Sequence, residues 1–271
     1  MMKNTSFVKK MRQNHRMTFF EENVIQVEDK TVINDEGKKA GYQKLRDYYI
    51  SMFRMIDMMH YNSTVTESVY RKYIGSVAGK VIDISNKDIL NHKHLKDISN
   101  NIRLAFLAAP SSIKGYGILR QALDGLWEEG YRNFELHSYG NSAKSERYLF
   151  THPRYKHEEL KQIMDYTDMV IVPSCWNETF GFVVLEALSY GVPVLLSERV
   201  GAKDIIDRGK TGIIVSPDAN SLKAEIRKVL DSPIQCLRGM NEYIVNNQTI
   251  KTMDMHTKEM VELYEEIRRV Y

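Results

Sequence analysis

Cysteine is scarce in this sequence of 271 residues, which contains only Cys175 and Cys236. The two cysteines lie far apart and show no metal-ligand spacing, so we predict neither a disulfide framework nor a zinc site. A reducing compartment is therefore expected. The sequence also lacks any Asp-x-Asp segment. It therefore offers no obvious ligands for a divalent metal ion, and we expect neither a metal nor another cofactor.

A strong charge of one sign and a long apolar run are also missing. The formal net charge is +3 at pH 7, which is too small for the basic stripe that nucleic-acid binding requires, so no nucleic-acid partner is expected. No apolar stretch is long enough for a signal peptide or a membrane span, so we expect a cytoplasmic protein. Before the first acidic residue the chain carries Lys3, Lys9, Lys10, Arg12 and Arg16. These residues indicate a solvated arm or, alternatively, peripheral attachment to the anionic inner surface of the membrane.

Apolar residues make up 43% of the chain, and after about residue 100 their pattern alternates between strand-like runs and helical periodicity. Strands are predicted over Leu104–Ala109, Phe134–Ser138, Met169–Val172, Val192–Leu196 and Gly212–Val215. Helices are predicted over Gly117–Glu129, Glu158–Tyr166, Phe182–Tyr190, Ala202–Arg208 and Ser221–Leu230. This alternation predicts an α/β fold with a doubly wound parallel sheet, whose ligand cleft lies at the carboxyl ends of the strands.

The flanking regions are also readable. A helix is predicted over Tyr42–Met59, and Thr64-x-x-Glu67 has the form of a capping box that starts a helix over Val65–Ile74. A strand over Lys80–Ile84 follows. The C-terminal segment predicts an amphipathic helix, with Met255, Glu259, Leu263 and Ile267 among its members.

Two carboxylates stand out between residues 173 and 193. Glu178 lies in a short loop before a glycine-containing helix start, and Glu186 lies in a helical run that is otherwise apolar. A helix that is apolar nearly all round is buried, and a carboxylate in it is costly to desolvate without a polar partner. Glu186 should therefore face a cleft, a partner or a ligand.

Three loops follow predicted strands and should open on one edge of the sheet. They carry Lys114-Gly115, Tyr139-Gly140-Asn141 and the segment from Glu178 to Gly181. Backbone N–H groups of Phe180, Gly181 and Phe182 at the helix start predict an anion site, to which Lys114 adds a positive charge. The simpler alternatives are that Glu178 only interacts favourably with the helix dipole and that Lys114 is a solvated loop residue.

The segment from about Met55 to Leu230 resembles the C-terminal half of retaining nucleotide-sugar glycosyltransferases with the GT-B fold, similar to glycosyltransferase family 4. Glu178 and Glu186 carry the resemblance, in a Glu-x7-Glu arrangement within an ungapped Pro-Ser...Glu-x-Phe-Gly...Glu-Ala...Gly-Val-Pro-Val pattern. Further matches are Ile113-Lys114-Gly115, Leu136 to Gly140, Glu158-Glu159-Leu160, Asp168, Gly201 with Asp204, and Lys210-Thr211-Gly212.

The resemblance implies a role for each site residue. Glu186 matches the residue that holds the nucleotide ribose, and Glu178 matches the residue that contacts the donor sugar. Lys114 joins Glu178 as a candidate catalytic residue. The remaining candidates for donor binding are Phe180, Gly181, Phe182, Gly115, Gly140 and Asn141. The implied reaction is metal-independent, retaining transfer of a sugar from a nucleotide-sugar, with UDP favoured as the nucleotide, to a glycan or lipid-linked acceptor in polysaccharide biosynthesis.

The sequence departs from the family pattern at several positions. Ala109 stands where the family has an arginine five residues before the lysine, and Asn86-Lys87-Asp88 stands where Asn-Gly is usual. The resemblance divides the chain into a shortened acceptor-side portion (residues 1–95), a donor-binding domain (96–250) and a C-terminal helix that returns toward the N-terminal portion (251–271).

The short first portion leaves alternatives open. One is a non-catalytic donor-binding module, or one that depends on a second protein chain to complete the acceptor site. Another is a hydrolytic or epimerase relative on the same fold, because a fold does not fix its chemistry.

Overall fold

The structure is a computed structural model that describes residues 35–53, 55–75 and 77–270. The chain forms two units, Met1–Met55 and Ile56–Tyr271. In the first unit the structure describes helix α2 (Asp35–Phe53). The helix predicted over Tyr42–Met59 therefore ends at Phe53, and Met59 instead starts a strand. The basic segment from Lys3 to Arg16 lies outside the described residues.

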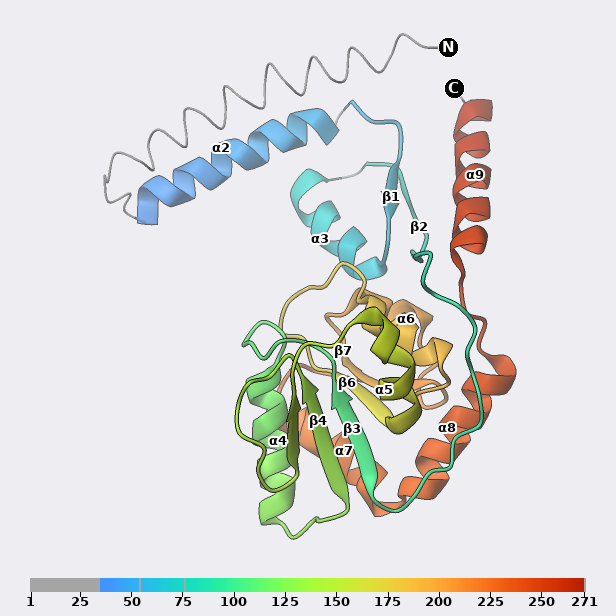
Figure 1. Cartoon of the computed structure of the whole chain (residues 1–271). Coiled ribbons are helices and arrows are strands. Elements are labelled where there is room, and N and C mark those ends of the chain that lie inside the picture. The colour runs from blue at the N-terminus through green and yellow to red at the C-terminus, as the bar shows by residue number, and fades with distance from the viewer. Residues whose placement is uncertain (1–34, 54, 76, 271) are drawn as a thin grey trace. The chain divides into compact units, whose positions relative to one another are not determined.

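The second unit contains a six-stranded parallel sheet with the order β5-β4-β3-β6-β7-β8 (Figure 1). Its strands are β3 (Ile102–Phe106), β4 (Phe134–Tyr139), β5 (Leu149–His152), β6 (Met169–Val172), β7 (Val194–Ser197) and β8 (Gly212–Val215). Its α-helices are α4 (Tyr116–Glu128), α5 (Leu160–Tyr166), α6 (Phe182–Ser189), α7 (Ala219–Asp231) and α8 (Pro233–Asn247). The predicted doubly wound parallel α/β fold is confirmed.

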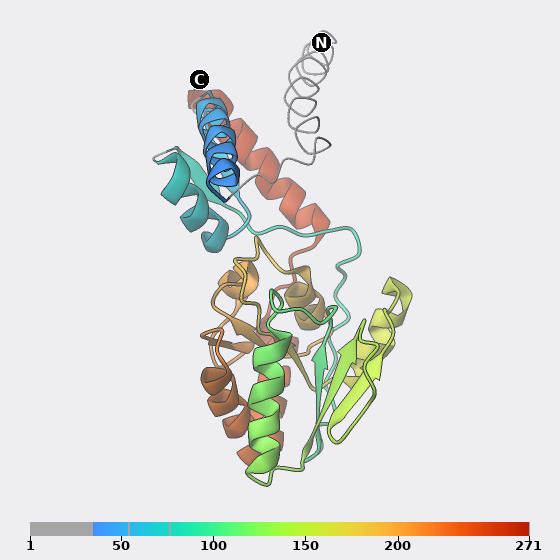
Figure 2. The same cartoon turned by 90° about the vertical axis from the view of Figure 1, so that its left-hand side faces the viewer.

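Each face of the sheet has its own hydrophobic core, because strand side chains alternate between the faces. Leu104 and Phe106 of β3 pack in the cluster that contains α4 and α7. Ala105 packs in the other cluster, with α5 and α6. Figure 2 shows α4 and α5 on opposite sides of the sheet. Burial on both faces explains why the central strands read as continuous apolar runs.

Several predicted elements differ from the structure. The first strand ends at Phe106 rather than Ala109, and the predicted helix Ala202–Arg208 is a short 3₁₀ helix, η2 (Gly201–Ile205). The edge strand β5 and helix α8 were not predicted. A second 3₁₀ turn, η1 (His157–Glu159), leads into α5.

A small second sheet precedes the large one. Strands β1 (Met59–Tyr61) and β2 (Gly79–Val81) are parallel and are connected by α3 (Thr64–Ile74). The predicted capping box is wrong by one residue, because Ser63 is the N-cap and accepts a hydrogen bond from the Thr66 N–H at 3.1 Å. The Thr64 hydroxyl instead donates to Asp204 in η2 at 2.6 Å.

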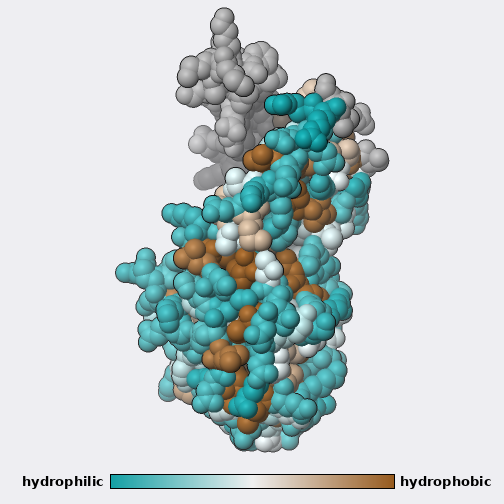
Figure 3. All heavy atoms as spheres, turned by 90° about the vertical axis from the view of Figure 1, so that its right-hand side faces the viewer, coloured by the Kyte–Doolittle hydropathy of each residue, from teal (hydrophilic) through white to brown (hydrophobic). Residues whose placement is uncertain are grey.

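Helix α9 (Met253–Val270) reaches this small sheet. The Lys80 ammonium lies 3.0 Å from the Glu266 carboxylate, and the mostly buried Lys251 bridges Asp83 and Glu259 at 2.5 and 2.6 Å. Figure 3 views the side that carries α9 and shows apolar residues among hydrophilic ones. Val261 and Tyr264 of α9 are 51% and 66% exposed.

A buried ion pair ties β3 to the start of β6. The Asp168 carboxylate is 0% exposed and accepts hydrogen bonds from the Arg103 backbone N–H at 2.8 Å and from its guanidinium at 2.8 and 2.6 Å. In return, the Asp168 N–H donates to the Arg103 carbonyl at 2.8 Å. Asp168, which we noted as a match to the family pattern, therefore fixes the two strands whose ends carry the candidate site.

We expect Asp168→Ala to lower the free energy of unfolding by about 3 kcal/mol, because it leaves the Arg103 guanidinium without its buried partner. Urea denaturation measures this loss. Asp165→Ala is the matched control. Asp165 pairs at the surface with Lys161 at 2.6 Å and with His94 at 3.6 Å, so this substitution should cost about 1 kcal/mol or less. Similar losses for the two variants would contradict the structural role of the buried pair.

Candidate functional site

The two candidate catalytic residues meet at the carboxyl ends of β3 and β6. Lys114 lies in the loop after β3, Glu178 lies in the loop after β6, and the Lys114 ammonium is 2.9 Å from the Glu178 carboxylate. The side chains are 43% and 13% exposed, respectively. An ion pair between these loops was not predicted, although their common edge was.

Gly115 makes this approach possible. It has a φ of 75°, and a Cβ atom at this position would lie 1.9 Å from the Pro173 carbonyl oxygen. The backbones of the two loops therefore touch in a way that only glycine permits. A hydrogen bond of 2.9 Å from the Cys175 N–H to the Ile113 carbonyl holds the loops together.

A cleft of about 170 Å³ lies between these loops and the start of α6. It is lined by Phe106, Leu107, Ala108, Lys114, Ile171, Val172, Pro173, Glu178, Gly181, Phe182 and Val183. Pockets that enclose whole drug-sized ligands usually measure about 300–1,000 Å³. The cleft is smaller than this, so it can hold only part of a nucleotide-sugar, and the rest of the molecule would lie outside it.

Backbone N–H groups gather where α6 begins. The N–H groups of Phe180, Gly181 and Phe182 donate to no other group among the described residues, and no side chain caps the helix. Gly181 has a φ of 101°, and a Cβ atom there would lie 2.8 Å from the Val200 side chain. The turn therefore requires glycine. Free N–H groups and the helix dipole together favour an anion.

Glu186 lies further along α6. It is four residues after Phe182, which places it on the same face of the helix, about 6 Å along the axis. It does not line the cleft that Lys114 and Glu178 share. Burial raises the pKa of its carboxyl group, with His157 lowering the pKa and Asp88 raising it to smaller extents. No described residue donates a hydrogen bond to this carboxylate.

The residues around Glu186 were not predicted from the sequence. Besides His157 and Asp88, these residues include Tyr155. Burial raises the pKa of the Tyr155 hydroxyl to about 12, and the Glu186 charge makes a smaller contribution to this rise. Tyr155 and His157 come from the loop between β5 and α5. Because strand β5 was not predicted, the position of this loop beside α6 could not be predicted either.

Gly140 and Asn141 do not line the cleft. The Asn141 amide is buried and donates to the Tyr116 hydroxyl at 2.9 Å and to the Ser138 hydroxyl at 3.1 Å. Asn141 thus holds its own loop in place. Gly140 has a φ of 69°, and a Cβ atom there would lie 3.5 Å from both Ala109 and the side chain of Arg154.

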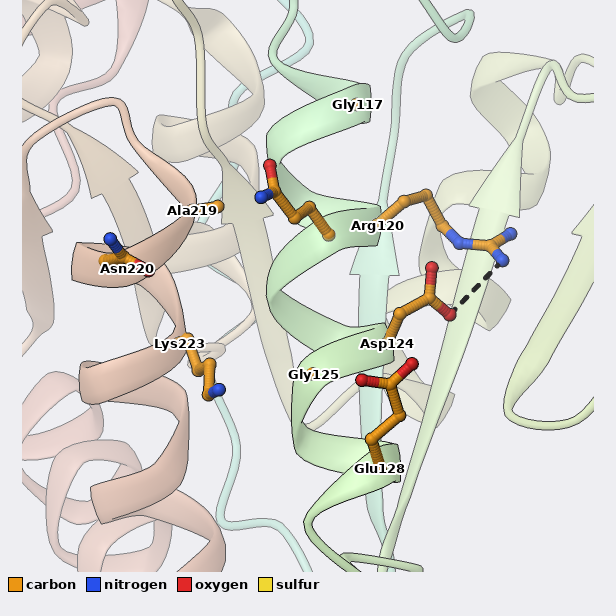
Figure 4. A pocket seen from close by; sticks show the side chains of 9 residues that line it. Gly117, Arg120, Asp124, Gly125, Glu128, Ala219, Asn220 and Lys223 are labelled. Atoms are coloured by element: carbon orange, nitrogen blue, oxygen red, sulfur yellow. Dashed lines mark ion pairs between the residues drawn. The ribbon is translucent and has the colours of Figure 1, made fainter.

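A second, more open groove of about 530 Å³ lies between α4 and α7 (Figure 4). Its lining comprises Gly117, Arg120, Gln121, Asp124, Gly125, Glu128, Ala219, Asn220 and Lys223. Its cations are paired: Arg120 lies 3.7 Å from Asp124, and Lys223 lies 2.6 Å from Glu129. The groove contains none of the site residues identified from the sequence.

Within residues 35–53, 55–75 and 77–270, no three or more His, Cys, Asp or Glu side chains gather as ligands for a metal ion. No helix in the same part is both long and apolar enough to cross a membrane.

Comparison with known proteins gives a family match. The model of the family "Glycosyl transferases group 1" matches residues 91–248. An uncharacterized glycosyltransferase of Methanocaldococcus jannaschii is 37% identical over 91 residues, which are 33% of this chain and 22% of that protein. D-inositol 3-phosphate glycosyltransferase of Corynebacterium jeikeium is 33% identical over 112 residues, which are 41% of this chain and 26% of that protein. The matches span about a quarter of these relatives.

Solved structures share the fold. Sucrose-phosphate synthase from Thermosynechococcus elongatus superposes with a TM-score of 0.65 at 18% identity, covering 84% of this chain and 63% of that one. HepE from Anabaena, solved with UDP-glucose, gives a TM-score of 0.64 at 17% identity, covering 83% and 68%. The parallel sheet is that of the Rossmann-like half of GT-B glycosyltransferases.

The raised pKa of Glu186 predicts a pH-dependent effect of Glu186→Gln. The folded state binds the proton of the Glu186 carboxyl group more tightly than the unfolded state does. Wild-type stability therefore falls as the pH rises from the ordinary glutamate pKa through the raised pKa of the folded state. Glutamine cannot ionise and avoids this loss. We expect the variant to match the wild type near pH 4 and to be the more stable protein at pH 7 to 8.

Chemical denaturation at both pH values measures this difference. Glu158→Gln, at an exposed position in η1, is the control and should change the free energy of unfolding little at either pH. If the difference in the free energy of unfolding between the wild type and Glu186→Gln is the same at both pH values, burial of the carboxylate has no energetic consequence.

Proposed function

The chain belongs to the glycosyl transferases group 1 family, and on that premise we propose that it transfers a sugar from a nucleotide-sugar to an acceptor hydroxyl with retention of configuration. The observation that carries the proposal is the Lys114–Glu178 pair, which shares a cleft with Gly181 at the start of α6. A cation, a carboxylate and free N–H groups are the elements needed to bind a diphosphate and its sugar together.

The departing nucleoside diphosphate gains negative charge in the transition state. Lys114 and the N–H groups of Phe180, Gly181 and Phe182 are held in place beforehand, so they stabilise this charge without a large reorganisation. Glu178 has the complementary role: its carboxylate is the anion beside the electron-deficient sugar carbon. In the free protein its bond to Lys114 keeps the ammonium in the cleft until the diphosphate competes for it.

Glu186 is the proposed ribose ligand. Its two oxygens can each accept a hydrogen bond from one hydroxyl of a vicinal diol. Such bonds stabilise the charged form and oppose the effect of burial on the pKa. Tyr155, whose hydroxyl pKa is raised in part by the Glu186 charge, is a further candidate for the same nucleoside site. We favour UDP as the nucleotide, which is supported by the solved complex of HepE with UDP-glucose.

A second positive charge comes from Arg154 in this proposal. Ala109 replaces the arginine of the family pattern, yet the Arg154 side chain lies beside Gly140, which neighbours Ala109. Arg154 is exposed and forms no ion pair with another described residue. We propose that it supplies the missing charge from a different loop. Two cations and a helix start are our grounds for proposing that the transfer is metal-independent.

The acceptor is proposed to be a glycan or a lipid-linked sugar. The rival candidate is a donor-binding module that requires a second chain for transfer. Transfer assays with added acceptor distinguish the two, because only the first candidate transfers sugar as a single chain.

The two carboxylates should have separable effects on binding. We expect Glu186→Ala to weaken UDP and UDP-glucose alike, by about 1–3 kcal/mol for lost hydrogen bonds to a charged group. Glu178→Ala should not weaken UDP, because it removes the competitor of the diphosphate for Lys114, but it should remove the additional affinity that the sugar provides. Isothermal titration calorimetry with both ligands measures these effects.

The titrations are made in EDTA and repeated with Mg²⁺, and the affinities should agree. Arg154→Gln belongs to the same series and should weaken UDP but not uridine. Equal losses of UDP affinity in both glutamate variants would reject the separate roles. Failure of the wild type to bind any nucleoside diphosphate would reject the proposed function.

A further inference from the structure

Three consecutive carbonyl groups of the site loop accept hydrogen bonds from η2 or from the N-terminus of α3. The Glu178 carbonyl accepts the Gly201 N–H at 3.0 Å, and the Phe180 carbonyl accepts the Ala202 N–H at 2.7 Å. Between them, the Thr179 carbonyl accepts the Ser63 hydroxyl at 2.6 Å. The loop is therefore held through its carbonyls by η2 and by the N-terminus of α3.

The orientation of the carbonyls fixes the orientation of the N–H groups. In a trans peptide the C=O and the N–H of one peptide unit point in opposite directions, and the described residues contain no cis peptide bond. The Thr179 carbonyl and the Phe180 N–H belong to one peptide unit. Because Ser63 holds the carbonyl on the α3 side, the Phe180 N–H points away from α3.

We propose that Ser63 is a positioning residue for the anion site, which it serves by fixing the Thr179–Phe180 peptide so that the Phe180 N–H is available to the diphosphate. This inference rests on the proposed function for the identity of the anion. A donor on the carbonyl also polarises the amide and strengthens its N–H as a donor. Ser63 touches no substrate atom in this role.

Ser63 is suited to hold one orientation. Its side chain is 1% exposed, and its oxygen accepts the Thr66 N–H at 3.1 Å, which leaves the hydroxyl proton for Thr179. Thr66 also lies 3.1 Å from the Thr179 carbonyl, but its single hydroxyl proton has a nearer acceptor in Asn62, at 2.6 Å. Ser63 is therefore the principal donor.

Gly201 leaves the space that this contact needs. A Cβ atom at Gly201 would lie 2.3 Å from the Thr179 carbonyl oxygen and 2.5 Å from the Ser63 hydroxyl. Thr64 provides a separate link at the same junction, because its N–H and its hydroxyl both donate to Asp204 at 2.6 Å. Thr64 does not bond to the Thr179 carbonyl, which makes it the matched control.

The test compares Ser63→Ala with Thr64→Val in the full chain, using UDP and uridine as calorimetric probes. We expect Ser63→Ala to weaken UDP binding about 3- to 10-fold, the effect of one hydrogen bond, and to leave uridine binding unchanged. Thr64→Val should leave both affinities unchanged. Ser63→Cys keeps a weak donor and should give a smaller loss; it replaces Ser63→Ala if loss of the N-cap unfolds the latter.

A readout without ligand comes from the amide resonance of Phe180 in a ¹H–¹⁵N spectrum. It should shift in the Ser63 variants and not in Thr64→Val. An unmoved resonance, or equal losses for UDP and uridine, would overturn the positioning role. If wild type binds no UDP, the proposed function fails, and the Phe180 resonance still decides whether Ser63 sets the peptide orientation.

Discussion

The close approach of two loop backbones, at Gly115 and Pro173, is the constraint on which the candidate site depends. Their strands, β3 and β6, are neighbours in the sheet and are tied by the buried Arg103–Asp168 pair. With the strand ends fixed, a loop that carried any side chain at residue 115 would meet the Pro173 carbonyl. The contact sets the reach of Lys114 and brings it to Glu178. The anion site at the start of α6 begins at Phe180, two residues after Glu178 on the same loop.

The site combines positions that a purely structural protein would avoid. Glu186 occupies an otherwise apolar helix and has a raised pKa because of burial. The N–H groups at the start of α6 lack partners among the described residues, while the carbonyls of Glu178, Thr179 and Phe180 all accept hydrogen bonds. Polar groups left unpaired on one side of a rigid loop favour a ligand on that side. The stability lost at these positions is consistent with a binding site that is organised in advance.

Sequence patterns predicted what depends on local residues. Strands β6 and β8 have the predicted bounds, because short continuous apolar runs between turns identify buried parallel strands. The loop positions of Lys114 and Glu178 followed from the rule for parallel sheets. Edge strand β5 (Leu-Phe-Thr-His) was missed because it is not a continuous apolar run, and its Phe150 is exposed. The hydrogen bond between Ser63 and Thr179 joins residues 116 positions apart. The sequence pattern placed the capping box at Thr64, so it gave no reason to single out Ser63. Contacts of that kind depend on the assembled fold and leave no local signal.

We propose that one cleft, at the ends of β3 and β6 and the start of α6, binds a nucleoside diphosphate without a metal ion. A crystal structure of the chain grown with UDP and EDTA would show where the nucleotide binds. We expect the diphosphate between the Lys114 ammonium and the Phe180, Gly181 and Phe182 N–H groups, with the ribose hydroxyls on Glu186. UDP bound elsewhere, or bound in this cleft only when a divalent cation is supplied, would contradict it.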